Sequence, residues 1–295
     1  MPAKGAVERR RAVLLVLGAA AFWSLAAGCV KALGGALPLA EVIFCRNLFC
    51  IPVLLPVLWR AGGLAALRTR NPAMHALRTA SGLMGMVGAF YGYGTLPLAL
   101  VTALGFTMPL FLTLLSIPVL GERVGPRRAA AVAVGFAGVV LIAGPGGMPG
   151  GQLPAMAMVL MGALGWAISM ISIRLMGDAG EKGVAIVLWF AIGAAAVSGL
   201  AALPVWVAPT PGQWALLIGT GLISAFGQLL MTEAYRRGEA TLNAPFEYSA
   251  ILWTTAIGAI GWAELPDGWD VVGMLVLVGS GLYIWRRELV LRVRR

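Results

Sequence analysis

Two stretches of this sequence share one pattern: residues 18–24 read GAAAFWS, and residues 161–167 read MGALGWA. Each stretch places a tryptophan at its sixth position, Trp23 in the first and Trp166 in the second. The second tryptophan follows the first by nearly half of the 295-residue chain. This spacing predicts an internal repeat.

Other landmarks recur at almost the same offset. Lys31 follows Trp23 by eight residues, and Arg174 follows Trp166 by eight. Two further pairs, Glu122 with Glu264 and Tyr93 with Tyr235, share one offset that is a single position shorter than that of the tryptophans. Several landmarks in the same order at a nearly constant offset indicate two homologous halves.

The composition identifies lipid as the solvent of both halves. Apolar residues make up 60% of the chain, charged residues 12%, and the mean hydropathy is +0.88, whereas soluble domains carry roughly 25% charged residues. Such a chain is not a soluble enzyme, a secreted disulfide scaffold or a disordered protein. The three cysteines, Cys29, Cys45 and Cys50, lie in apolar stretches without metal-ligand spacing, so we expect no metal, cofactor or disulfide.

A transmembrane helix needs about 20 mostly apolar residues, and the chain offers ten such segments separated by short turns. They are 12–33, 39–59, 73–94, 97–120, 128–144, 154–176, 184–206, 213–235, 241–263 and 269–286.

The basic residues orient these spans. With the N-terminus in the cytoplasm, every lysine and arginine falls in a cytoplasmic segment or at the cytoplasmic end of a span, except Lys31, Arg46 and Arg78, which lie within spans. Positive residues favour the cytoplasmic side, so we expect both termini there. The net charge of +10 is then explained by orientation and by contact with anionic lipid head groups, and not by nucleic acid.

The expected domain organisation follows from these spans: a cytoplasmic N-terminus (1–11), a first repeat (12–144), an outer linker (145–153), a second repeat (154–286) and a basic cytoplasmic C-terminus (287–295). Because each repeat has five spans, the second enters the membrane from the opposite side. We therefore expect an all-α membrane protein of two inverted five-helix repeats, a plan that recurs in secondary transporters.

A tryptophan early in spans one and six, and a Gly-Glu type motif after spans four and nine, resemble the drug/metabolite transporter superfamily. The EamA family is the most similar branch. The resemblance implies a bacterial inner-membrane protein with a cavity lined by spans one to four and six to nine, while spans five and ten are peripheral. It also implies export or exchange of small metabolites, as in YddG-type amino acid exporters; other members carry riboflavin or S-adenosylmethionine.

Polar and aromatic residues inside the spans are the candidates for a substrate cavity, because ionisable groups in a membrane are costly and need a reason. Arg46 is either a ligand for a substrate carboxylate or a structural tie, and Arg78 either pairs with Glu247 or serves a substrate. The full set of cavity candidates is Trp23, Arg46, Asn47, Arg78, Tyr91, Trp166, Gln228, Glu247 and Tyr248.

Three smaller groups complete the candidates. Pro109 and Pro245 interrupt spans four and nine and are expected hinges. Glu122 and Glu264 are expected to cap the helices that follow them. His75, whose ordinary pKa lies near neutrality, and Glu233 are candidates for proton coupling.

The resulting hypothesis is a secondary transporter of small amphipathic metabolites, with export of neutral or aromatic amino acids by alternating access as the main reading. One alternative is a larger metabolite, such as riboflavin or S-adenosylmethionine, which the small residues of span three would accommodate. A membrane-embedded transferase is a weaker alternative. The chain lacks a GxxxxGK[ST] nucleotide-binding loop, so we do not expect it to hydrolyse ATP. We expect a small-molecule substrate, a lipid bilayer, and a monomer or homodimer.

Overall fold

The computed structural model describes residues 2–120, 125–143, 152–237 and 245–293. In chain order its α-helices are α1 (Pro2–Ala32), α2 (Leu39–Arg60), α3 (Pro72–Thr95), α4 (Leu98–Gly105), α5 (Met108–Leu120), α6 (Pro126–Ala143), α7 (Gln152–Asp178), α8 (Gly183–Ala202), α9 (Pro211–Arg237), α11 (Ser249–Trp262) and α12 (Gly268–Val293). Short 3-10 helices, η1 (Gly63–Leu67) and η2 (Leu203–Val205), follow α2 and α8. The described residues contain no strand, which confirms the all-α class.

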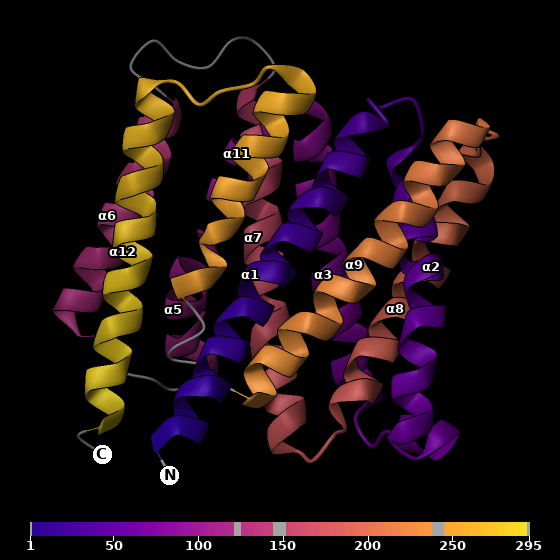
Figure 1. Ribbon diagram of the computed structural model, residues 1–295, viewed down its shortest axis with the longest axis horizontal. Coiled ribbons are helices and arrows are strands. Elements are labelled where there is room, and N and C mark those ends of the chain that lie inside the picture. The colour runs from indigo at the N-terminus through magenta and orange to yellow at the C-terminus, as the bar shows by residue number, and fades with distance from the viewer. Residues whose placement is uncertain (1, 121–124, 144–151, 238–244, 294–295) are drawn as a thin grey trace.

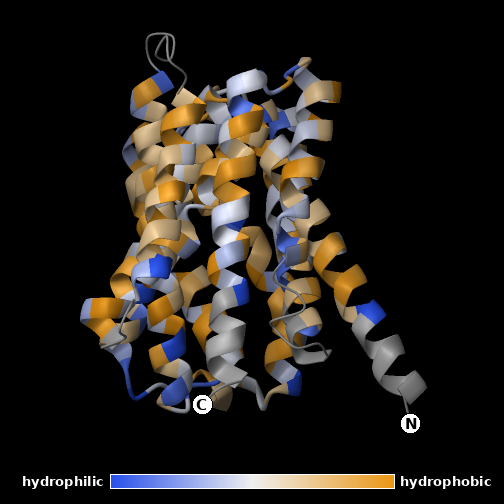
Figure 2. Cartoon of the chain, turned by 90° about the vertical axis from the view of Figure 1, so that its left-hand side faces the viewer, coloured by the Kyte–Doolittle hydropathy of each residue, from blue (hydrophilic) through white to orange (hydrophobic). Residues whose placement is uncertain are grey.

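Eight segments of the described chain are long and apolar enough to cross a membrane. Seven of them lie within α1, α2, α6, α7, α9, α12 and the pair α8–η2, and the eighth combines α4 and α5. The two remaining predicted spans correspond to α3, which carries His75 and Arg78, and to the shorter α11. Figure 2 shows hydrophobic residues along most of the helices and hydrophilic residues toward both ends of the bundle.

Eight helical segments form a closed ring. α2 packs on α8, α8 on α3, α3 on α7, α7 on α4 and α5, α4 on α11, α11 on α1, α1 on α9, and α9 returns to α2. α6 and α12 pack on each other at one side of the ring and touch it through α5 and α4 (Figure 1). The ring therefore contains spans one to four and six to nine, as the resemblance implies.

The packing is symmetric under exchange of the two halves. The α1–α9 contact is matched by α7–α3, the α2–α9 contact by α8–α3, and the α1–α11 contact by α7 with α4 and α5. The pairs α2–α8, α4–α11 and α6–α12 map onto themselves. α1 begins and α12 finishes at the same end of the bundle (Figure 1). The sequence repeat is thus also a repeat of tertiary contacts.

Glycine allows the backbones of α3 and α7 to touch. A Cβ atom added at Gly88 would lie 2.8 Å from the Cα of Gly162, and one added at Gly165 would lie 2.6 Å from the carbonyl oxygen of Ser81. Close approach through small residues is a common way for helices to associate in membranes. This contact joins the first half of the chain to the second.

The fourth helical segment of each half is interrupted at an equivalent residue. In the first half, Phe106 and Thr107 separate α4 from α5. In the second half, residues 245–247 are helical, Tyr248 forms a turn, and α11 begins at Ser249. Phe106 and Tyr248 are repeat mates, with the same offset as Tyr93 and Tyr235, and their rings pack with centroids 4.5 Å apart. The two interruptions therefore meet near the pseudo-twofold axis, the axis that relates the two halves of the chain.

Candidate functional site

Arg46 lies in α2 and is held by its neighbour Asn47. The guanidinium Nη1 of Arg46 donates to the side-chain oxygen of Asn47 at 3.1 Å. The amide nitrogen of Asn47 donates in turn to the carbonyl of Ile43 at 2.8 Å and lies 3.7 Å from the sulfur of Met86. Asn47 is completely buried, whereas Arg46 is only partly buried. Asn47 thus orients Arg46 and does not itself present an open surface to a solute.

Arg78 lies on α3 and meets side chains of α7 and α8. Its Nη1 donates to the hydroxyl of Ser169 at 3.3 Å, and that hydroxyl is 2.8 Å from the hydroxyl of Ser81. The guanidinium carbon lies 4.1 Å from the ring centroid of Phe190 and 6.0 Å from that of Trp166. These are cation–π contacts, which gain strength away from water.

The two guanidinium groups lack an acidic counterpart in the described part of the chain. Neither guanidinium forms an ion pair with a described carboxylate, so the structure does not show the pairing of Arg78 with Glu247. The buried Nε of Arg78 also has no hydrogen-bond partner among the described residues. Buried charges are normally paired, so this cluster is suited to a carboxylate or another anion.

Trp23 and Trp166 occupy equivalent helix contacts. A Cβ atom at Gly227 of α9 would lie 2.7 Å from the Trp23 ring, and one at Gly85 of α3 would lie 2.6 Å from the Trp166 ring. Gly85 and Gly227 are themselves repeat mates. The indole of Trp23 also donates to the carbonyl of Ser224 at 3.3 Å. Both rings therefore fill contacts between the halves, and Trp166 additionally borders the Arg78 cluster.

The small residues of span three do not leave open space for a large solute at this level. Gly85 is covered by the ring of Trp166, and a Cβ atom at Gly82 would clash with the ring of Phe190 and the guanidinium of Arg78. In this structure aromatic side chains of the second half occupy this face, so a solute would enter it only after those rings move apart.

The remaining cavity candidates have other contacts. Tyr91 is 40% exposed on α3. Tyr248 packs on Phe106 and touches α12 at Gly281. Gln228, Glu233 and Glu247 are partly buried and engage other groups.

The expected hinge prolines flank the interruptions described above. Pro109 lies in the first turn of α5, directly after the break at Phe106 and Thr107. Pro245 precedes the turn at Tyr248 by three residues. Proline lacks the N–H that would bond to the carbonyl four residues before it, which explains the break before Pro109.

Glu264 does not cap α12, and that prediction is wrong. The backbone N–H of Asp270 donates to the carboxylate of Asp267 at 2.8 Å, and the N–H of Asp267 donates to that of Asp270 at 3.1 Å. These two aspartates form the reciprocal capping arrangement. Glu264 instead accepts from Lys31 at 2.8 Å. Its repeat mate Glu122 lies outside the described residues.

Lys31 is the centre of this contact. Its ammonium also donates to the carbonyl of Leu96 at 2.9 Å and lies 5.6 Å from the ring of Trp262. Lys31→Met and Glu264→Gln are each expected to lower the thermal midpoint and the free energy of unfolding. The double variant should lose less free energy of unfolding than the sum of the two single variants, by about 0.5–3 kcal/mol. Thermal unfolding of all four proteins in one detergent measures this coupling. Additive losses would show that the pair contributes no interaction energy.

His75 and Glu181 join the two halves at the end that carries the termini. The hydroxyl of Thr69 donates to Glu181 at 2.6 Å, and the N–H of Arg70 donates to the same oxygen at 3.1 Å. The Nε2 of His75 lies 3.6 Å from the other carboxylate oxygen. The hydrogen bond from Thr69 is the main cause that lowers the pKa of Glu181. Burial raises this pKa, whereas the N–H of Arg70 and the ring of His75 lower it further, so the pKa is lowered overall.

This lowered pKa makes stability depend on pH. A carboxylate with a lowered folded-state pKa contributes its full stability above the ordinary value of 4.5 and loses it as pH falls through the folded value. Glu181→Gln is expected to be less stable than the wild type at pH 7 and to lose less stability between pH 4.5 and pH 3.5. Thermal midpoints across this range measure the effect. The exposed Asp178→Asn variant is the control, and an unchanged pH profile of Glu181→Gln would contradict the expectation.

Several residues of the site are not predicted by the sequence. Arg78 is contacted by Ser169 and Phe190, and the α2–α3 loop is contacted by Glu181, only because helices far apart in sequence pack together. Phe106 could have been found, because it is the repeat mate of Tyr248 and stands next to a proline-containing segment.

Comparison with known proteins agrees with this architecture. The EamA-like transporter family matches residues 10–144 and 153–286. A riboflavin transporter of Rhizobium johnstonii is 32% identical, with 96% of this chain and 95% of that protein covered. The pseudopaline exporter CntI of Pseudomonas aeruginosa is 30% identical, with 94% and 96% covered.

Two further comparisons extend this result. An S-adenosylmethionine uptake transporter of Rickettsia prowazekii is 28% identical, with 86% of this chain and 85% of that protein covered. A protein of known crystal structure shares the fold, with a TM-score of 0.66 at 22% identity over 94% of this chain and 97% of that one. The chain therefore belongs to the EamA-like transporter family, and it is a multi-pass inner-membrane transporter and not an enzyme.

Proposed function

We propose that this protein is a ten-span secondary transporter for a larger metabolite that carries a planar ring system and a carboxylate. The observation that carries the proposal is the pair of arginines, Arg46 and Arg78, which have no carboxylate partner in the described part of the chain. The planar fork of arginine suits a carboxylate, while the rings of Trp166 and Phe190 beside Arg78 suit a flat ring.

The proposed orientation places both termini in the cytoplasm, with repeats at 12–144 and 154–286. The clustering of lysines and arginines in the segments assigned to the cytoplasm supports it. Alternating access then occurs by movement of the halves about the pseudo-twofold axis. The interruptions at Phe106 and Tyr248 are the proposed bending points, because the interrupted helices lack continuous hydrogen bonding there.

The relatives favour a larger substrate over the amino acids of the main hypothesis. Their names specify riboflavin, pseudopaline and S-adenosylmethionine. The direction of transport differs among them, since one is named an exporter and another an uptake transporter. Riboflavin is the second candidate, supported by the 32% identity to a riboflavin transporter, and it differs from the first in having no carboxylate.

Transport into proteoliposomes separates these candidates. Radiolabelled S-adenosylmethionine, riboflavin, phenylalanine and alanine would each be supplied with and without a proton gradient. Saturable transport of S-adenosylmethionine, competed by other carboxylated ring compounds, is the expected result. Transport of riboflavin alone would favour the second candidate, and transport of amino acids alone would overturn the larger-metabolite proposal. A dependence on the gradient would be tested next in His75→Gln and Glu233→Gln.

A further inference from the structure

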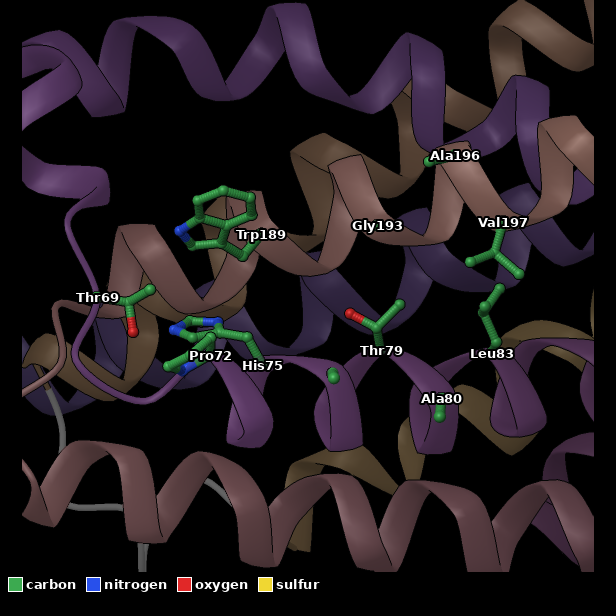
Figure 3. A pocket seen from close by; sticks show the side chains of 11 residues that line it. Thr69, Pro72, His75, Thr79, Ala80, Leu83, Trp189, Gly193, Ala196 and Val197 are labelled. Atoms are coloured by element: carbon green, nitrogen blue, oxygen red, sulfur yellow. The ribbon is translucent and has the colours of Figure 1, made fainter.

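An apolar groove runs between α3 and α8 on the outside of the ring. Its volume is about 460 Å³, within the range of small-molecule sites. Small residues form much of it: Ala76 of α3, and Ala80 of α3 with Gly193 and Ala196 of α8 (Figure 3). Ala80 and Ala196 are exposed. In a membrane-spanning protein these exposed apolar surfaces face lipid chains.

The groove ends at a basic cluster. Thr69 and His75 line one end of the groove (Figure 3). Arg68 and Arg70 flank Thr69, and with Lys182 they border a second hollow of about 200 Å³. The apolar groove thus ends beside three cations.

These cations have capacity for a ligand. Arg68, Arg70 and Lys182 are all exposed. The ammonium of Lys182 has three N–H donors and uses one of them for the carbonyl of Ala61 at 3.3 Å, so the others can bind a ligand. Glu181 is the acidic residue of this hollow. Its oxygens already accept from Thr69 and the N–H of Arg70 and lie next to His75.

His75 is a second observation that points to a ligand. Its side chain is 7% exposed, and it lines the groove. Among the described residues its Nδ1 has no hydrogen-bond partner, and its Nε2 lies 3.6 Å from the Glu181 carboxylate, which is too long for a hydrogen bond. A buried ring nitrogen without a partner is costly, and a polar head group at the mouth of the groove would supply one.

We infer that this groove binds an anionic phospholipid, with an acyl chain between α3 and α8 and the phosphate head group at Arg68, Arg70 and Lys182. The charge of the cluster is complementary to such a head group, and in the proposed orientation it faces the anionic cytoplasmic leaflet. The inference concerns lipid binding and does not depend on the identity of the transported solute.

Lipid titration of the purified full-length protein in detergent tests this inference. Phosphatidylglycerol is expected to raise the thermal midpoint saturably, and native mass spectrometry should show one retained lipid. Phosphatidylcholine with the same acyl chains should do so far less. Soluble glycerol phosphate should have no effect, because it lacks the chain that fills the groove.

Variants address each part of the site. Arg68→Gln, Arg70→Gln and Lys182→Gln combined should weaken the apparent affinity for phosphatidylglycerol by about 10- to 100-fold, and Ala80→Trp should weaken it by filling the groove. Arg127→Gln and Ala137→Trp replace exposed residues of α6 and serve as matched controls. The readout is the lipid-dependent shift within each variant, so a change in basal stability does not obscure it.

Two outcomes would overturn the inference. Equal stabilisation by phosphatidylglycerol and phosphatidylcholine would show a non-specific lipid annulus. Unchanged lipid affinity in both the combined charge variant and Ala80→Trp would show that the lipid binds elsewhere.

Discussion

Arg78→Ala is expected to raise the concentration of carboxylated substrate needed for half-maximal transport by about 10- to 100-fold, since a hydrogen bond to a charged group contributes about 1.5–3 kcal/mol. The guanidinium lies against Phe190 and donates to Ser169, which positions it without neutralising it. A substrate carboxylate would supply the missing negative charge. Transport by proteoliposomes, with the carboxylated solute and its uncharged amide compared, measures the change.

Two variants separate charge from geometry. Arg78→Lys keeps the charge but loses the planar fork that stacks on the rings and binds a carboxylate through two hydrogen bonds. It should therefore recover only part of the loss. Arg127→Ala removes an exposed arginine at the start of α6 and should leave transport unchanged. An equal loss for the carboxylated solute and its amide would show that Arg78 acts on packing and not on substrate charge.

The second large effect is expected at Gly88, where α3 and α7 touch through their backbones. A Cβ atom there would clash with the carbonyl of Met158 and lie 2.8 Å from Gly162. Backbone atoms cannot rotate away as a flexible side chain can, so Gly88→Val must separate the helices. We expect a loss of about 3 kcal/mol and a fall in the thermal midpoint on the order of 10 °C.

Gly94 provides the matched control within the same helix. A Cβ atom at Gly94 would have no heavy atom of the described residues within 4 Å, so Gly94→Val should leave the thermal midpoint close to that of the wild type. Thermal unfolding in detergent, followed by loss of a monodisperse peak on size exclusion, measures both variants. Similar midpoints for Gly88→Val and Gly94→Val would mean that α3 and α7 are not held at this distance.

The sequence by itself determined the class of protein, its two repeats and its family. These properties depend on local quantities: the length and hydropathy of each segment, and landmarks at a constant offset. Lipid excludes unpaired backbone groups, so long apolar segments in a chain of this kind become helices. The repeat also fixed which helices are equivalent, as the matching contacts of α1–α9 and α7–α3 show.

Only the tertiary structure decided the partners of the charged and aromatic side chains. Lys31 could have met several acidic groups, and the packing of α1 beside α11 brought it to Glu264. Arg78 met Ser169 and Phe190, and Thr69 met Glu181, although these partners lie in the other half of the sequence. The physical reason is that hydropathy places a residue at a depth in the membrane, whereas a side-chain contact also requires the rotation of each helix and the identity of its neighbour. Both are set by how small residues such as Gly85 and Gly88 let particular backbones approach.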